Sequence, residues 1–141
     1  MLERVFNPER LDAVIGHPSV KPHVSLGLDE VPSVGFLLDD PANVCLMNEH
    51  GGFLFRQFLP DQYDVHTMFL PSGRGKRALD AAREAKRIMF DEYHARRLVT
   101  FVPHENRPAR KLAEAVGFVE DIEAECMGVP GVTMVLEATC Q

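Results

Sequence analysis

The sequence predicts a single domain of the α/β (α+β) class, in which antiparallel strands are followed by strands that alternate with helices. Its 141 residues are enough for one hydrophobic core and too few for two. Short apolar runs separated by turn residues fill the first half, and two amphipathic helical patterns occur in the second half. The chain is 45% hydrophobic and 26% charged, as is typical of a globular protein. We therefore expect one domain over residues 1–141.

The first predicted element is a short amphipathic helix. Asn7 is a favourable N-cap, Pro8 suits the first helical position, and Gly16 follows the last apolar residue. The residues at helical spacing between them are Leu11, Val14 and Ile15. The segment from His17 to Pro32 is rich in Pro, His, Ser and Gly, so we expect a loop that could lie over a site.

Four strands are predicted next. Three apolar runs, separated by Asp39-Asp40-Pro41 and by Glu49-His50-Gly51-Gly52, predict an antiparallel meander: Val34 to Leu38, Val44 to Met47 and Phe53 to Phe58. The fourth strand, residues 64–70, alternates between two faces. One face carries Val65, Thr67 and Phe69, and the other carries His66, Met68 and Leu70.

The second half predicts a β-α-β-α-β-β order when the fourth strand is included. The helical stripe from Ala78 to Tyr93 is the clearest pattern in the chain. A buried strand from Leu98 to Val102 ends at Pro103, and a second helix is capped by Asn106 and stopped by Gly117. The last strands are expected at Ile122 to Met127 and Val132 to Ala138.

The turn between the fourth strand and the long helix predicts an anion site. Free amides and the positive dipole end of a helix N-terminus favour a phosphate, and Gly73 and Gly75 allow close approach of the main chain. The basic residues of the turn are Arg74, Lys76 and Arg77. A nucleotide P-loop is excluded because Lys76 is followed by Arg77 and not by Ser or Thr.

Composition excludes several classes of function. A net charge of −6 argues against nucleic-acid binding. No apolar run approaches the length of a membrane span, and residues 1–5 do not resemble a signal peptide, so we expect a soluble, cytoplasmic protein. The three cysteines lack the spacing of a zinc site or a disulfide framework, and the loop histidines lack ligand spacing, so no metal is expected.

Two motifs occur together in the second half of the chain: the Arg74-Gly75-Lys76 turn after a strand, and Asn106-x-x-Ala109 with Gly117-Phe118 downstream. With these motifs the chain resembles the Gcn5-related N-acetyltransferase (GNAT) superfamily. The similarity covers roughly residues 34 to 137. The run from Tyr63 to Pro71 also resembles small GNAT-type proteins of bacteriophages and prophages.

The resemblance implies a central mixed, mostly antiparallel sheet of six to seven strands, with a splayed parallel pair and three to four helices. Acetyl-coenzyme A would lie between residues 64–70 and 98–102, with its pyrophosphate on the turn at 73–79. An amine would attack the thioester directly, and a main-chain N–H near Met68 to Leu70 would stabilise the oxyanion. The residues implied in binding acetyl-CoA are Met68, Phe69, Leu70, Gly73, Arg74, Gly75, Lys76, Arg77, Ala78 and Asn106.

Two residues have alternative roles, and the sequence departs from the family pattern at two places. His66 is the candidate general base, and a histidine hydrogen-bonded within the sheet is the alternative reading. Asn106 is an N-cap that could also serve the site. Arg77 and Leu79 stand where relatives carry small residues, and Ala113 stands where many carry a tyrosine that protonates the departing thiolate.

Two functions are therefore expected. The first is an acetyl-CoA-dependent N-acetyltransferase acting on a small-molecule or peptide amine, such as a polyamine, a lysine or an aminoglycoside. The second is a GNAT-fold binding or structural module, of phage type, that has lost the chemistry, which Ala113 and the crowded turn favour. The terminal strands 122–127 and 132–138 could supply an edge for a homodimer.

Overall fold

The fold was determined as a computed structural model that describes residues 1–20 and 35–138. Most of the predicted loop from His17 to Pro32 lies outside the described residues. In chain order the elements are β1 (Glu3–Arg4), α1 (Pro8–Ile15), the 3₁₀ helix η1 (Gly35–Asp39), β2 (Val44–Asn48), β3 (Gly51–Leu59), β4 (Gln62–Phe69), η2 (Pro71–Gly73), α3 (Lys76–Asp91), β5 (Arg97–Pro103), α4 (Arg107–Val116), β6 (Val119–Cys126) and β7 (Val129–Glu137).

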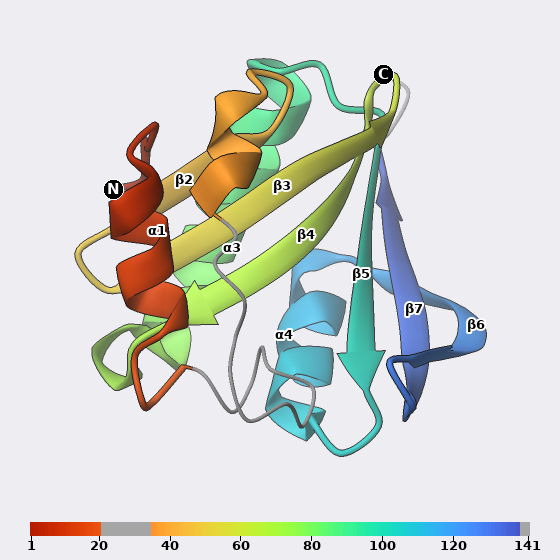
Figure 1. The fold of residues 1–141 in the computed structure, drawn as a ribbon. Coiled ribbons are helices and arrows are strands. Elements are labelled where there is room, and N and C mark those ends of the chain that lie inside the picture. Colours follow the sequence, from red (N-terminus) through yellow and green to blue (C-terminus); the bar gives the residue numbers. More distant parts are fainter. Residues whose placement is uncertain (21–34, 139–141) are drawn as a thin grey trace.

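The strands form one seven-stranded mixed sheet in the order β1-β2-β3-β4-β5-β7-β6 (Figure 1). Strands β2, β3 and β4 form the predicted antiparallel meander, and β4 and β5 are the predicted parallel pair. Strand β7 lies antiparallel between β5 and β6. The prediction of a mixed, mostly antiparallel sheet with one parallel pair is therefore confirmed.

The strand predicted at 34–38 is wrong for its described part, which is the 3₁₀ helix η1. The Gly35 N–H donates to Asp12 Oδ1 at 2.9 Å, and a Cβ at Gly35 would lie 2.6 Å from the Pro8 carbonyl oxygen. This segment therefore packs on α1 and does not extend the sheet. The edge beside β2 is taken by β1, whose two charged residues, Glu3 and Arg4, carry no strand signal.

The helix caps follow the predictions. Asn7 Oδ1 accepts from the Glu9 N–H at 2.9 Å, and Asn106 Oδ1 accepts from the Ala109 N–H at 3.2 Å. Gly117, with φ of 116°, ends α4 in the left-handed conformation. Helix α3 begins at Lys76, two residues earlier than predicted, after Gly75 in its N-cap position.

Helices cover both faces of the sheet, with α1 and η1 on one face and α3 and α4 on the other (Figure 1). Tyr63, Val65 and Phe69 of β4 pack in one cluster with α3, and Met68 packs in another with α1. The alanines of α3 bring this helix close to the sheet, and they are Ala78, Ala81, Ala82 and Ala85. Within residues 1–20 and 35–138, no helix is long and apolar enough to cross a membrane.

Candidate functional site

Strands β4 and β5 stay paired over only three positions. The register runs from Gln62↔Arg97 to Asp64↔Val99. Beyond that point β4 continues to Phe69 and β5 continues to Pro103, but the two strands no longer pair with each other. Figure 1 shows the two strands diverging from this point, with α4 lying behind the gap. The sheet therefore splits between β4 and β5 beyond Asp64 and Val99, and we call this opening the fork.

A cavity of about 470 Å³ occupies the fork. Its walls come from β4 and β5 and from the facing sides of α3 and α4. Small side chains account for much of the room on the helical side, namely Ala82, Ala85, Ala109 and Ala113. The volume lies in the range of small-molecule sites, which are largely apolar with a few polar groups. The polar groups at this cavity include Asp64, His66 and Asn106.

The main-chain groups of β4 alternate between its two neighbours. The Leu70 N–H donates to the His50 carbonyl oxygen at 2.8 Å, on the β3 side. Because antiparallel ladders alternate and the register is regular here, Met68 and His66 also direct their main-chain groups toward β3. The N–H groups of Thr67 and Phe69 therefore face the fork. Of the stretch expected to stabilise an oxyanion, Phe69 has the suitable orientation, and the Leu70 amide is already bonded.

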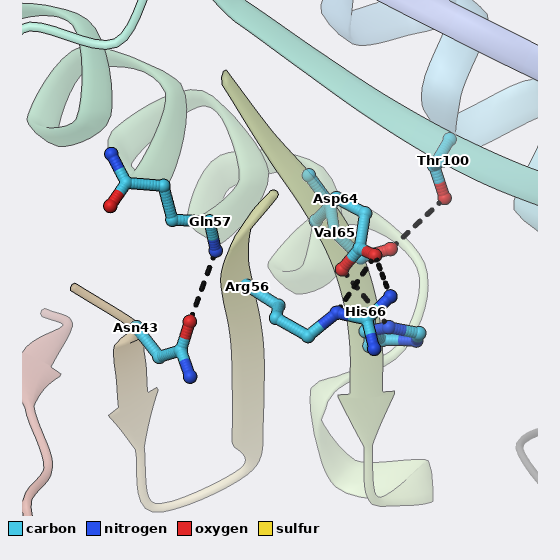
Figure 2. A network of polar contacts seen from close by, with 7 residues as sticks. All are labelled: Asn43, Arg56, Gln57, Asp64, Val65, His66 and Thr100. Atoms are coloured by element: carbon cyan, nitrogen blue, oxygen red, sulfur yellow. Dashed lines mark hydrogen bonds and ion pairs between the residues drawn. The ribbon is translucent and has the colours of Figure 1, made fainter. Parts of the chain in front are cut away.

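A charged cluster lines the α1 side of the fork (Figure 2). Arg56 on β3 lies opposite Asp64 on β4, and its Nε and Nη2 donate to Asp64 Oδ2 at 3.1 and 2.5 Å. His66 follows two residues later on the same strand face, and its Nε2 lies 3.3 Å from Asp64 Oδ1. Oδ1 is buried and accepts no other hydrogen bond from the described residues. The His66 ring is 56% exposed, so it remains open on its other side.

The Asp64 carboxylate is held ionised by its neighbours. Burial favours the protonated acid, but the hydrogen bonds and positive charges of His66 and Arg56 outweigh burial and lower the pKa of Asp64 below its ordinary 3.8. Sequence reasoning found His66 and missed Asp64 and Arg56. The spacing of two residues between Asp64 and His66 was the available signal, since such residues share one face of a strand.

The predicted anion turn is partly used for packing. Gly73 is buried, and a Cβ there would lie 2.5 Å from the Cβ of His50. Arg74 donates through Nε to the Phe69 carbonyl oxygen at 3.3 Å and through Nη2 to the Ser19 carbonyl oxygen at 2.5 Å. Arg77 donates to the Ser72 carbonyl oxygen. Two of the three basic side chains therefore bond to main-chain carbonyl groups.

The start of α3 keeps the features of an anion site. Gly75 has a φ of 74° with nothing within 4 Å of a Cβ built on it, and no side chain caps the helix. Lys76 is highly exposed, with its ammonium 3.9 Å from Asp80. Ala78 is buried against the sheet. The main-chain amides at 76–78 therefore lie at an uncapped helix end, beside one exposed lysine.

Helix α4 contributes the opposite wall. Asn106 uses its side chain as the predicted N-cap, and it also lines the cavity. Ala113 is buried in the same wall and leaves no hydroxyl there. A second hollow, of about 610 Å³, lies between β1 and the outer side of α3, lined by Arg10, His50, Arg77, Asp80 and Glu84 among others. It shares no lining residue with the cavity in the fork, and we regard the fork as the candidate site.

A parallel pair that splays within a mixed sheet, with helices on both faces, defines the fold of the GNAT acetyltransferases. The chain has a TM-score of 0.67 to an acetyltransferase of the GNAT family from Bacillus anthracis, at 15% identity over 95% of this chain and 90% of that one. No family model matches the sequence, and no curated protein sequence matches it. The fold, and not the sequence, carries the similarity.

Two further solved structures are similar over nearly the whole chain. The spermidine N-acetyltransferase from Vibrio cholerae, in complex with CoA and spermine, has a TM-score of 0.76 at 14% identity, covering 97% of this chain and 94% of that one. The ribosomal-protein-S5-alanine acetyltransferase from Vibrio fischeri has a TM-score of 0.75 at 13% identity, covering 96% and 91%. The first of these two enzymes is named for a small polyamine, and the second is named for a ribosomal protein.

Proposed function

We propose that the protein is an acetyl-CoA-dependent N-acetyltransferase that acetylates an amine by direct attack on the thioester. The observation that carries the proposal is the fork after Asp64 and Val99, which holds a cavity of about 470 Å³ with an ionised carboxylate and a histidine at its wall. Solved structures of this fold include an acetyltransferase with bound CoA.

The residues of the fork fit such a co-substrate. The alanine-rich wall between α3 and α4 suits the slender pantetheine arm, and the unpaired edge of β4 offers main-chain N–H groups to its amides and carbonyl. The uncapped start of α3, with exposed Lys76, suits the pyrophosphate. Acetyl-CoA supplies a thioester whose carbonyl carbon accepts the amine and whose thiolate departs.

Side chains and main-chain groups of β4 have different roles in the proposed acetyl transfer. His66 accepts the proton that the ammonium group must lose before its nitrogen can attack the thioester, and Asp64 orients the ring and stabilises the imidazolium. The second proton, which the nitrogen loses after the C–N bond forms, goes to water or to the departing thiolate. The Phe69 N–H group donates to the thioester carbonyl oxygen as negative charge develops on it, and the Thr67 N–H group is placed to hold the pantetheine arm. With Ala113 in the helical wall, no side chain of α4 at this position protonates the thiolate, which is a good leaving group near neutral pH.

We propose a cationic small-molecule amine as the acceptor. An alkylamine reaches the site protonated, and the net charge of −6 on the chain favours the approach of a cation. The spermine of the Vibrio cholerae complex is of this class. The peptide amine is the other candidate acceptor, and an amine panel that includes spermine and an alanine-initiated peptide separates the two.

The second candidate is a GNAT-fold module that binds acyl-CoA and does not transfer the acyl group. Ala113 is the observation that favours it, because no hydroxyl lines the cavity there. A relationship to phage-type members, a cytoplasmic location and a homodimer formed through the terminal strands remain predictions from the sequence.

Thiol release from acetyl-CoA tests the proposal. The purified protein is incubated with acetyl-CoA and each amine of the panel, and free CoA is measured together with the mass of the acetylated product. We expect amine-dependent CoA release with a product 42 Da heavier than the amine, the mass of an acetyl group that replaces a proton. Acetyl-CoA binding without release on any amine would support the binding module.

A further inference from the structure

We propose that Thr100 and Arg74 are positioning residues that cap two carbonyl groups on the free edge of β4, so that this edge presents mainly N–H donors to the fork. The proposal rests on the proposed function. Both residues lie outside β4, and each donates a hydrogen bond to a different main-chain carbonyl group of that strand. They act on the reaction through the β4 main chain, without contact with the reacting atoms.

Thr100 acts where the fork begins. Its Oγ1 donates to the Val65 carbonyl oxygen at 3.1 Å, one residue beyond the last registered pair, Asp64↔Val99 (Figure 2). Without this hydroxyl, the Val65 carbonyl group would be the first unpaired acceptor on the β4 edge. The side chain thus takes the place of a strand partner after the strands have separated.

Arg74 acts at the other end of the same edge. Its Nε donates to the Phe69 carbonyl oxygen at 3.3 Å, and its Nη2 is held by the Ser19 carbonyl oxygen. The guanidinium is therefore fixed at two points and placed over the end of β4. This placement differs from the phosphate contact expected of Arg74 from the turn motif.

Between these two caps lie the N–H groups of Thr67 and Phe69, which the ladder alternation turns toward β5. An uncapped carbonyl oxygen beside them would repel the negative charge that develops on the thioester oxygen. A hydrogen bond from a side chain offsets part of the negative charge on a carbonyl oxygen, so the two caps reduce the repulsion at both ends of this stretch. The Thr67 carbonyl group lies between the two N–H groups without a side-chain cap among the described residues, and it is available to an amide N–H of the pantetheine arm.

The test compares Thr100→Val with Thr100→Ser. Valine keeps the branched shape and removes the hydroxyl, whereas serine keeps the hydroxyl. We expect the valine variant to lower kcat by about tenfold to a hundredfold with an unchanged Kd for acetyl-CoA, and the serine variant to restore most of kcat. An unchanged kcat in Thr100→Val, or an equal loss in both variants, would overturn the assignment.

Asn43 provides a matched control for stability. It is buried and also links main-chain groups, with Nδ2 on the Leu37 carbonyl oxygen and Oδ1 on the Gln57 N–H, away from the fork (Figure 2). Asn43→Ala should lower Tm and leave kcat at the wild-type value. If its kcat falls as much as that of Thr100→Val, the loss in both comes from destabilisation and the proposal fails.

Arg74→Lys separates capping from phosphate binding. Lysine keeps the charge and loses the Nε donor, so capping predicts a lower kcat with an unchanged Kd for acetyl-CoA. A raised Kd with an unchanged kcat would assign Arg74 to the phosphates and overturn this half of the proposal. Absence of turnover by the wild-type protein would overturn the proposed function and the inference with it, whereas active wild type with unaffected variants would overturn the inference alone.

Discussion

His66 and Asp64 lie on the same face of β4, with Nε2 of the ring 3.3 Å from Oδ1 of the carboxylate. The other carboxylate oxygen is bonded twice by Arg56. This arrangement directs Nε2 toward Asp64 and leaves Nδ1 as the ring nitrogen available to a substrate. The structure therefore gives His66 a carboxylate partner that orients its ring beside the fork, as a general base requires.

Replacement of His66 by alanine should lower kcat with little change in the Kd for acetyl-CoA. A general base contributes about 10² to 10⁴ in rate, and the ring has no part in the proposed contacts to the co-substrate. His94→Asn is the control, since His94 is exposed in the segment between α3 and β5, does not line the cavity, and has a φ of 56°, a conformation that asparagine accepts. Wild-type kcat in His66→Ala would assign the base elsewhere.

Asp64→Asn should make the free energy of unfolding depend less on pH in the acidic range. The pKa of Asp64 is lowered in the folded state, so its carboxylate stabilises the fold above the unfolded-state value of 3.8. That stability is lost as pH falls from about 5 through the folded-state pKa. Urea midpoints between pH 6 and pH 3 should fall more steeply for the wild type than for Asp64→Asn, and parallel curves would contradict the ionised cluster.

Gly75→Asp should weaken acetyl-CoA binding by about tenfold, because it places a negative charge at the start of α3 beside the proposed pyrophosphate site. Gly75→Ala is its control. A Cβ at this position has nothing within 4 Å and meets the same strain at φ of 74° in both variants, so the alanine variant measures the effect of the main chain without the charge. Calorimetric Kd values that are equal for the two variants would show that the phosphates bind elsewhere.

Cys45 should resist alkylation in the folded protein. Burial raises the pKa of the Cys45 thiol to about 11, so almost none is thiolate at pH 8. Iodoacetamide labelling followed by peptide mass mapping should modify Cys126, which is half-buried, before Cys45. Cys45 lies in a buried cluster with Leu11 of α1 and Met68 of β4. Labelling of Cys45 at the rate of Cys126 would show that this cluster opens readily to solvent.

Much of the fold follows from local patterns. The helix caps at Asn7 and Asn106 and the stop at Gly117 are encoded by single residues, so the sequence predicts them. Strand β1 is different, because Glu3 and Arg4 form a strand only through pairing with Met47 and Leu46 of β2. The segment 35–39 has the apolar composition of a strand, and its contact with Asp12 of α1 decides otherwise.

The candidate site was predictable in position and less so in detail. The parallel pair and the turn before the long helix could be placed from their order along the chain, although the helix begins two residues earlier than predicted. The Arg56–Asp64 contact depends on the β3–β4 register, which runs to a bulge near Gln57 and Leu59. The engagement of Arg74 by the Ser19 and Phe69 carbonyl groups depends on tertiary packing that no motif encodes.

Calorimetric titration with acetyl-CoA tests the central claim most directly, since the fork is proposed to hold that molecule. We expect saturable one-to-one binding, with the amide signals of Thr67 and Phe69 shifted in parallel nuclear magnetic resonance spectra. No heat and no shift at millimolar acetyl-CoA would contradict the account, and the fork between β4 and β5 would then serve another purpose.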